Sequence, residues 1–156
     1  MASTILSRAS PVFRSMLGPH FREGHELAAS GSVELALDDA CAAHMAIICR
    51  VLHMRIDGVP LRFESKAILE IAALADKYDC CKALAAMAYT WISEGLHAAG
   101  EAVSCQTRCD FFAASYLFKH KILFSRLAHD LVLYTKPSDE ASHEHYPKTV
   151  AKVLCE

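Results

Sequence analysis

Residues 65–80, Ser-Lys-Ala-Ile-Leu-Glu-Ile-Ala-Ala-Leu-Ala-Asp-Lys-Tyr-Asp-Cys, form the stretch that decides the fold of this chain. Apolar residues recur in it at three- and four-residue steps, the spacing of one helix face. They are Ile68, Ile71, Ala72 and Ala75. Ser65 stands where a helix cap is expected. The stretch therefore predicts a helix from Ser65 to Tyr78 with one face in a core.

Helical patterns continue on both sides of this stretch. Apolar spacing predicts helices over 40–53 and 80–92, a break between Gly95 and Gly100, and two further helical segments that are interrupted near His120 and end at Pro137. Residues 4–17 predict two short helices meeting at Ser10-Pro11, since serine caps helices and proline suits their first turn. Residues 18–31 carry three glycines and predict a surface loop. No internal repeat is evident.

One segment, residues 32–37, has the alternation of a β-strand. Val33, Leu35 and Leu37 share one face, and Glu34 lies on the other. The acidic pair that follows, residues 38–39, can cap the next helix. We therefore expect an α+β protein that is predominantly helical, with a small residual sheet built on this strand.

Composition places the chain among folded, non-membrane proteins. It has 156 residues, 53% of them hydrophobic and 22% charged, which suits one domain with a core. The 16 basic and 18 acidic residues divide evenly between the two halves, so neither half predicts a surface for nucleic acid. The longest run without a charged residue, 83–93, is 11 residues. A membrane-spanning helix needs about 20, so no membrane span is expected.

The cysteines and the first residues bear on the compartment. Seven cysteines form an odd set in which two are adjacent, which favours reduced thiols. The first ten residues lack the basic and apolar regions of a secretory signal. We therefore expect an intracellular protein of the cytoplasm or nucleus.

No arrangement of residues predicts a catalytic, cofactor or metal site. Cys41, Cys49 and His53 can align on one helix, but no second ligand pair of zinc-site spacing lies nearby, so buried thiols and a helix-end histidine are expected instead. The same holds for the other cysteines, and 143–145 (His-Glu-His) is expected to be solvated. Nucleophile elbow, phosphate loop and dinucleotide motifs are absent from the sequence. A metal-dependent or thiol enzyme remains the alternative.

Several short sequence segments, in the order in which they occur, resemble those of the BTB/POZ domains abundant in filamentous fungi. The most typical is Leu69–Cys80, Leu-Glu-Ile-Ala-Ala-Leu-Ala-Asp-Lys-Tyr-Asp-Cys. The others are Leu6–Leu17, Phe21–Gly24, Val33–Asp39, Val51–His53, Trp91-Ile92, Ala113–Phe118 and Leu123-Phe124. The resemblance covers about residues 3–135. It implies a truncated BTB/POZ domain over 1–93, a C-terminal helical extension packed on it over 101–136, and a polar tail over 137–156.

The resemblance has one departure at the N-terminus. The family opens with a β-hairpin that leads into a histidine-bearing helix, whereas this chain begins inside that helix. Without the hairpin, the strand at 33–37 would leave backbone groups unpaired and apolar surface uncovered. We therefore expect a partner, a second copy or a compensating helix to cover the gap. A shortened or degenerate form without adaptor activity is an alternative.

The resemblance implies a non-enzymatic module that binds other proteins. Members of the family dimerise through N-terminal helices, and some dock a cullin scaffold of a ubiquitin ligase. For a homodimer the expected contact residues are Leu6, Phe13 and Met16, which could equally be intramolecular core. For a cullin-type partner they are His53, Met54, Arg55, Ile56 and Asp57.

Overall fold

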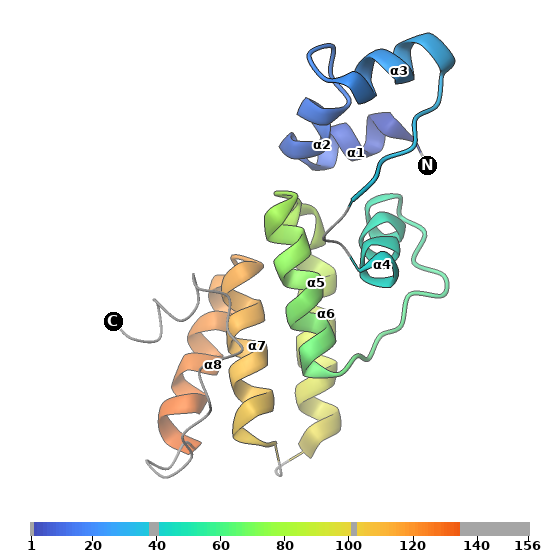
Figure 1. Cartoon of the computed structure of the whole chain (residues 1–156). Coiled ribbons are helices and arrows are strands. Elements are labelled where there is room, and N and C mark those ends of the chain that lie inside the picture. The colour runs from blue at the N-terminus through green and yellow to red at the C-terminus, as the bar shows by residue number, and fades with distance from the viewer. Residues whose placement is uncertain (1, 38–40, 101–102, 135–156) are drawn as a thin grey trace.

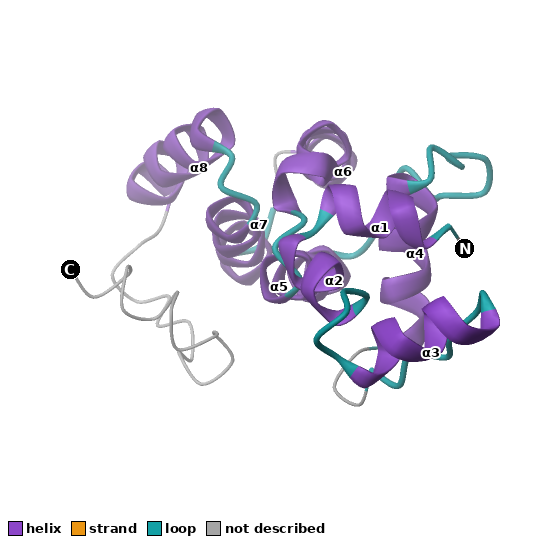
Figure 2. Cartoon of the chain, turned by 90° about the horizontal axis from the view of Figure 1, so that it is seen from above, coloured by secondary structure: helices purple, strands orange, loops and turns teal. Residues whose placement is uncertain are grey.

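The computed structural model describes residues 2–37, 41–100 and 103–134, which form eight α-helices (Figure 1). The helices are α1 Ser3–Ala9, α2 Pro11–Met16, α3 Arg22–Ser30, α4 Ala42–Leu52, α5 Ser65–Lys77, α6 Cys81–Ala99, α7 Cys105–Leu117 and α8 Lys121–Tyr134. Seen from above, α7 and α8 lie on one side of α5, and α1, α3 and α4 lie on the other (Figure 2).

The predicted small sheet is wrong, because the described residues contain no strand. Residues 32–37 instead run as uncoiled backbone from the end of α3 toward α4 (Figure 1). The alternation is kept: Val33, Leu35 and Leu37 are half-buried, and Glu34 and Ala36 are exposed. A strand also needs a hydrogen-bonded neighbour, and no described segment supplies one. The α+β class is therefore corrected to an all-helical fold over the described residues.

The surface loop predicted for residues 18–31 is also wrong, because residues 22–30 form α3. Its glycines serve packing and helix termination. A Cβ on Gly24 would lie 1.8 Å from the carbonyl oxygen of Gly18, so only glycine permits this close approach. Gly31 ends the helix at φ 74°, in the left-handed region that favours glycine.

The two short N-terminal helices are confirmed, and α2 is anchored to the end of α5. The Ser10 hydroxyl accepts a hydrogen bond from the backbone N–H of Phe13 at 3.0 Å, as a helix cap does. The same hydroxyl donates to the carbonyl oxygen of Tyr78. The rings of Phe13 and Tyr78 stack with centroids 4.9 Å apart. These contacts attach the N-terminal helices to the rest of the molecule.

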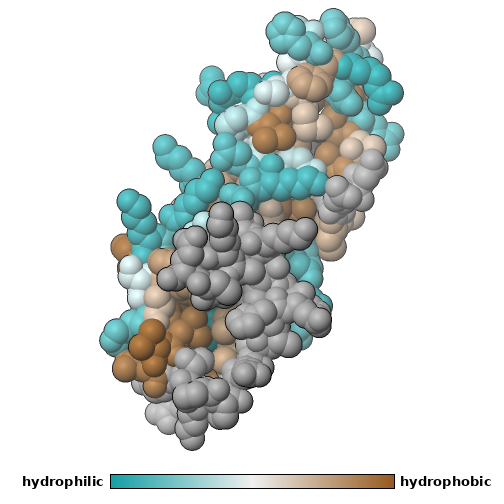
Figure 3. Space-filling view, turned by 60° about the vertical axis from the view of Figure 1, so that its left-hand side comes forward, coloured by the Kyte–Doolittle hydropathy of each residue, from teal (hydrophilic) through white to brown (hydrophobic). Residues whose placement is uncertain are grey.

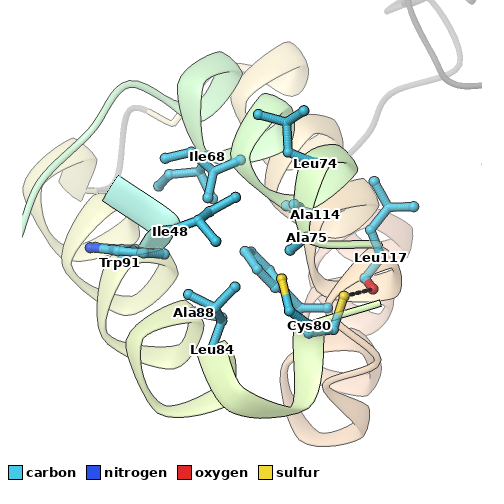
Figure 4. Packing of buried hydrophobic residues seen from close by; sticks show 14 of the residues in the cluster. Ile48, Ile68, Leu74, Ala75, Cys80, Leu84, Ala88, Trp91, Ala114 and Leu117 are labelled. Atoms are coloured by element: carbon cyan, nitrogen blue, oxygen red, sulfur yellow. Dashed lines mark hydrogen bonds between the residues drawn. The ribbon is translucent and has the colours of Figure 1, made fainter. Parts of the chain in front are cut away.

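Helix α5 lies at the centre of the core. Its contact with α7 is the most extensive between described helices, and it also packs on α4 and α6. Ile48 of α4, Ile68 of α5 and Leu84 of α6 are fully buried and point into one cluster (Figure 4). Asp110 of α7, also buried, accepts hydrogen bonds from the Ser65 hydroxyl at 2.6 Å and from the Gln106 amide at 2.8 Å.

Helix α6 passes through the break predicted at Gly95 and ends only before Gly100. Gly95 is a packing position, since a Cβ there would lie 2.5 Å from Cζ of Phe111 in α7. The interruption near His120 is confirmed by the turn between α7 and α8. The helix cap expected at 38–39, the stop at Pro137, the tail 137–156 and the histidines of 143–145 lie outside the described residues.

Candidate protein-interaction surfaces

The N-terminal residues expected at a homodimer contact lie largely inside the molecule. Leu6 and Phe13 are buried, and Met16 is half-buried against the core. The Phe13 ring lies on Tyr78 of the same chain. In this structure, therefore, the contacts of Leu6 and Phe13 are intramolecular.

The segment after α4 turns sharply and leaves the helix in a defined direction. The N–H of Arg55 donates to the carbonyl of Arg50, and the N–H of Met54 donates to that of Val51, both at 2.9 Å. This bond pair is the Schellman motif, which requires a left-handed residue, and Met54 takes that role at φ 56°. The motif fixes the backbone on which Met54 and Arg55 are presented.

The far half of this loop is held against α6. The indole N–H of Trp91 donates to the carbonyl oxygen of Pro60 at 3.0 Å, and the Phe63 ring meets the Trp91 ring edge to face at 5.6 Å. Val59 is buried, and its N–H donates to the carbonyl oxygen of Ile56. The loop is thus fixed at both ends and in its middle.

This anchored loop displays apolar side chains to solvent. The exposed fractions are 80% for Met54, 44% for Ile56 and 56% for Leu61. Arg55 and Asp57 are also exposed. We call these five residues the α4–α5 loop surface. Four of them belong to the segment predicted for a cullin-type partner. Leu61 was missed, although its position beside Pro60, between the helices predicted over 40–53 and from Ser65 to Tyr78, was a usable signal.

His53, the fifth residue predicted there, has an intramolecular role. Its Nε2 lies 3.1 Å from the backbone N–H of Ala2, and its Nδ1 lies 2.7 Å from the carbonyl oxygen of Cys49. Because the Ala2 N–H can only donate, Nε2 accepts, and the ring proton on Nδ1 donates to Cys49. His53 therefore ties the start of α1 to the end of α4.

A second apolar feature is a groove of about 820 Å³ beside α1 and α4, which we call the α1–α4 groove. Its walls come from α1, α2, α3, α4 and residues 31–37. Its apolar lining side chains include Leu6, Phe13, Leu17, Leu27, Val33, Leu35, Leu37 and Met45. Glu34 is the one Asp, Glu, Lys or Arg among the described residues that line it. The strand-like alternation was the sequence signal for one wall, whereas the other walls meet only in the folded chain.

The buried cysteines are poorly suited to nucleophilic chemistry. Burial, with a smaller contribution from nearby negative groups, raises the pKa of Cys80 to about 12 and that of Cys81 to about 11. Burial also raises the pKa of Cys49. The Cys81 thiol donates to the carbonyl oxygen of Leu117 at 3.2 Å. Since the thiolate is the nucleophile and the metal ligand, burial and the raised pKa values disfavour both roles for these thiols.

Two further features of the described residues concern metal binding and membrane spanning. Over 2–37, 41–100 and 103–134, no three His, Cys, Asp or Glu side chains lie where they could hold a metal ion together. No helix in the same ranges is both long and apolar enough to cross a membrane.

No protein-family model, curated protein or solved structure matches this chain. The BTB/POZ resemblance therefore stays a prediction.

Proposed function

We propose that this chain is a non-enzymatic module for binding other proteins, of the kind that its resemblance to BTB/POZ domains implies. The observation that carries the proposal is the α4–α5 loop surface, where Met54, Ile56 and Leu61 are exposed on a fixed backbone. Clustered exposed apolar side chains mark interaction sites in soluble proteins. A fixed loop also loses little conformational entropy when it binds.

The chemistry of the surface suits a protein partner. Its apolar side chains can be buried against an apolar patch, and Arg55 and Asp57 supply charges of both signs at the rim. The intramolecular anchors behind the surface, Trp91 to Pro60 and His53 to Ala2, hold it in place. The resemblance makes a cullin-type scaffold the first partner to test.

A double variant, Met54→Gly with Ile56→Asp, tests the proposal. Glycine is favoured at the left-handed φ of Met54, and Ile56 is exposed, so the variant should keep its fold. The matched control is Ile122→Asp, because Ile122 is 74% exposed on α8 and remote in sequence from the loop.

The measurement is binding of a purified cullin-type scaffold, together with affinity capture from a native lysate, for the wild type and both variants. We expect the loop variant to lose binding by about tenfold or more, since interface centres carry most of the affinity. Ile122→Asp should bind as the wild type does. Equal binding by all three folded proteins would refute the role of this surface.

A metal-dependent or thiol enzyme is the competing proposal. Elemental analysis for zinc and thiol titration of the native protein distinguish the two. Stoichiometric metal, or one cysteine that reacts much faster than free cysteine, would favour the enzyme.

A further inference from the structure

We propose that the α1–α4 groove is a docking site for a β-strand of another polypeptide. The strand pairs with residues 33–37 through main-chain hydrogen bonds and places a lysine or arginine beside Glu34. This second surface is separate from the α4–α5 loop surface.

The backbone of residues 33–37 is the template on which the added strand would pair. Among the described residues, none of their N–H or C=O groups has a hydrogen-bond partner. A row of backbone donors and acceptors without protein partners is the template to which an extended peptide adds. Five residues present an edge of about 16 Å, the length of an ordinary strand.

The apolar lining of the groove suits the side chains of such a strand. Val33, Leu35 and Leu37 are half-buried along one wall, and Met45 and Ala46 of α4 line another. The apolar lining suits a strand whose alternate side chains are apolar, because those side chains would project toward one face of the added pair. The groove thus favours an alternating peptide.

The charge of the segment determines which polypeptide fits. Glu34 is exposed and is one of the residues that line the groove. The sequence of 33–39 carries three acidic residues and no basic one. A second copy would bring the same acidic segment toward this edge, whereas a basic strand would pair favourably with Glu34. The charge therefore favours another polypeptide with lysine or arginine on its polar face.

The experiment uses the full chain and two fluorescent peptides of about seven residues, long enough to cover the edge. One alternates valine with lysine, and the other alternates valine with glutamate. Binding is followed by anisotropy, and hydrogen exchange reports the amides of 33–37. We expect the lysine peptide to bind saturably and to slow exchange at 33–37, and the glutamate peptide to bind more weakly.

Three variants locate the contact. Glu34→Lys changes only an exposed side chain and should weaken the lysine peptide and strengthen the glutamate peptide, each by about two- to fivefold. Leu35→Pro and Ala36→Pro remove N–H groups that point to opposite edges of the segment, so one of them should weaken the lysine peptide by about tenfold. Circular dichroism checks that each variant is folded.

Several outcomes would overturn the proposal. They are failure of both peptides to bind at millimolar concentration, equal binding of the two peptides, unchanged exchange at 33–37 on saturation, and full binding by both folded proline variants. A wild-type dimer in sedimentation that dissociates on Ala36→Pro would assign the edge to a second copy instead. Each outcome leaves the test of the α4–α5 loop surface unaffected, because that test changes other residues.

Discussion

At the scale of single residues, Phe13 shows why a helix face alone does not identify an interface. The pattern left it open whether Phe13 meets a partner or the core of its own chain. The structure buries it fully against Tyr78, the residue that caps the end of α5. Its backbone N–H also donates to the capping hydroxyl of Ser10, so Phe13 helps to hold α2 against the end of α5.

We therefore expect Phe13→Ala to destabilise the fold. Truncation of a fully buried phenylalanine costs about 3–5 kcal/mol, because it removes buried area and leaves a cavity. Urea unfolding measures the change. The matched control is Phe21→Ala, where the ring is 48% exposed and the effect should be within about 0.5 kcal/mol. A Phe13→Ala protein as stable as the control would show that the ring does not pack as described.

The adjacent thiols Cys80 and Cys81 predict a pH dependence of stability. Their pKa values rise from 9.0 to about 12 and about 11 in the folded chain, chiefly through burial. Below pH 9 both states keep the protons and stability is unaffected. Above it the unfolded chain ionises first and binds fewer protons, so stability falls as pH rises toward the folded pKa values.

The measurement is the free energy of unfolding between pH 7 and pH 11. The double variant Cys80→Ala, Cys81→Ala should show a shallower decline above pH 9 than the wild type. Cys41→Ala, which removes an exposed thiol, should leave the slope unchanged. Equal slopes in all three proteins would contradict the burial of these thiols.

At the scale of elements, the consecutive helix pairs α5–α6 and α7–α8 have the same arrangement, which the sequence did not reveal. Helices α5 and α7 have 13 residues each and begin at Ser65 and Cys105, 40 positions apart. Each ends in a Schellman motif with a left-handed residue, Asp79 or Lys119, before the next helix starts. Neither left-handed residue is glycine, so the residue that usually indicates this turn in a sequence is absent. For that reason the amino-acid sequence shows no repeat.

The contact between Gly95 of α6 and Phe111 of α7 should make alanine less favourable than glycine at position 95, against the usual helix propensity. In a helix, alanine is more favourable than glycine by about 1 kcal/mol. At Gly95, however, a Cβ would clash with Phe111, and overpacking costs about 1–3 kcal/mol. We therefore expect Gly95→Ala to lower stability by up to about 2 kcal/mol in spite of the propensity gain, measured by urea unfolding.

The control for this prediction replaces Phe111, whose ring the new methyl group would meet. In a Phe111→Leu background the ring atom that the new methyl group would meet is gone, so Gly95→Ala should there be neutral or stabilising. If the alanine destabilises both backgrounds equally, the close approach of α6 to Phe111 is not the cause.

At the scale of the whole molecule, stability should be distributed unevenly. Helices α4, α5, α6 and α7 supply most of the core, whereas the N-terminal helices add Leu6 and Phe13 to it and are tied on by a few contacts such as Ser10 with Tyr78 and Ala2 with His53. Apolar side chains also reach the surface away from the core, as the brown residues in Figure 3 show. On α8 the exposed ones are Ile122, Val132 and Leu133.

Native-state hydrogen exchange measures this distribution. We expect the slowest amide exchange in the middle of α5 and α7, where local opening requires the core to open, and intermediate exchange in α1–α3. The amides of residues 33–37 should exchange fastest, because they have no hydrogen-bond partner among the described residues. Protection at 33–37 equal to that of α5 in the isolated chain would show that the segment is already paired.

The sequence by itself determined the helices with strong local signals. The stretch from Ser65 to Tyr78 could be predicted from helix spacing, and the corner at Ser10-Pro11 from capping and proline, because these signals act within a few residues. The cap predicted at Ser65 was wrong, because Glu64 holds the cap position and the Ser65 hydroxyl donates to Asp110. For the loop surface, residues 54–57 could be picked out from the resemblance, but their exposure could not.

The tertiary structure decided what depends on residues far apart in the chain. Whether 33–37 becomes a strand depends on a neighbour, whether Gly24 and Gly95 break or pack a helix depends on what approaches them, and whether Phe13 is surface or core depends on Tyr78. The groove arises only where α1, α4 and 31–37 meet. Local pattern sets conformation and the buried face, but only long-range packing determines what that face meets.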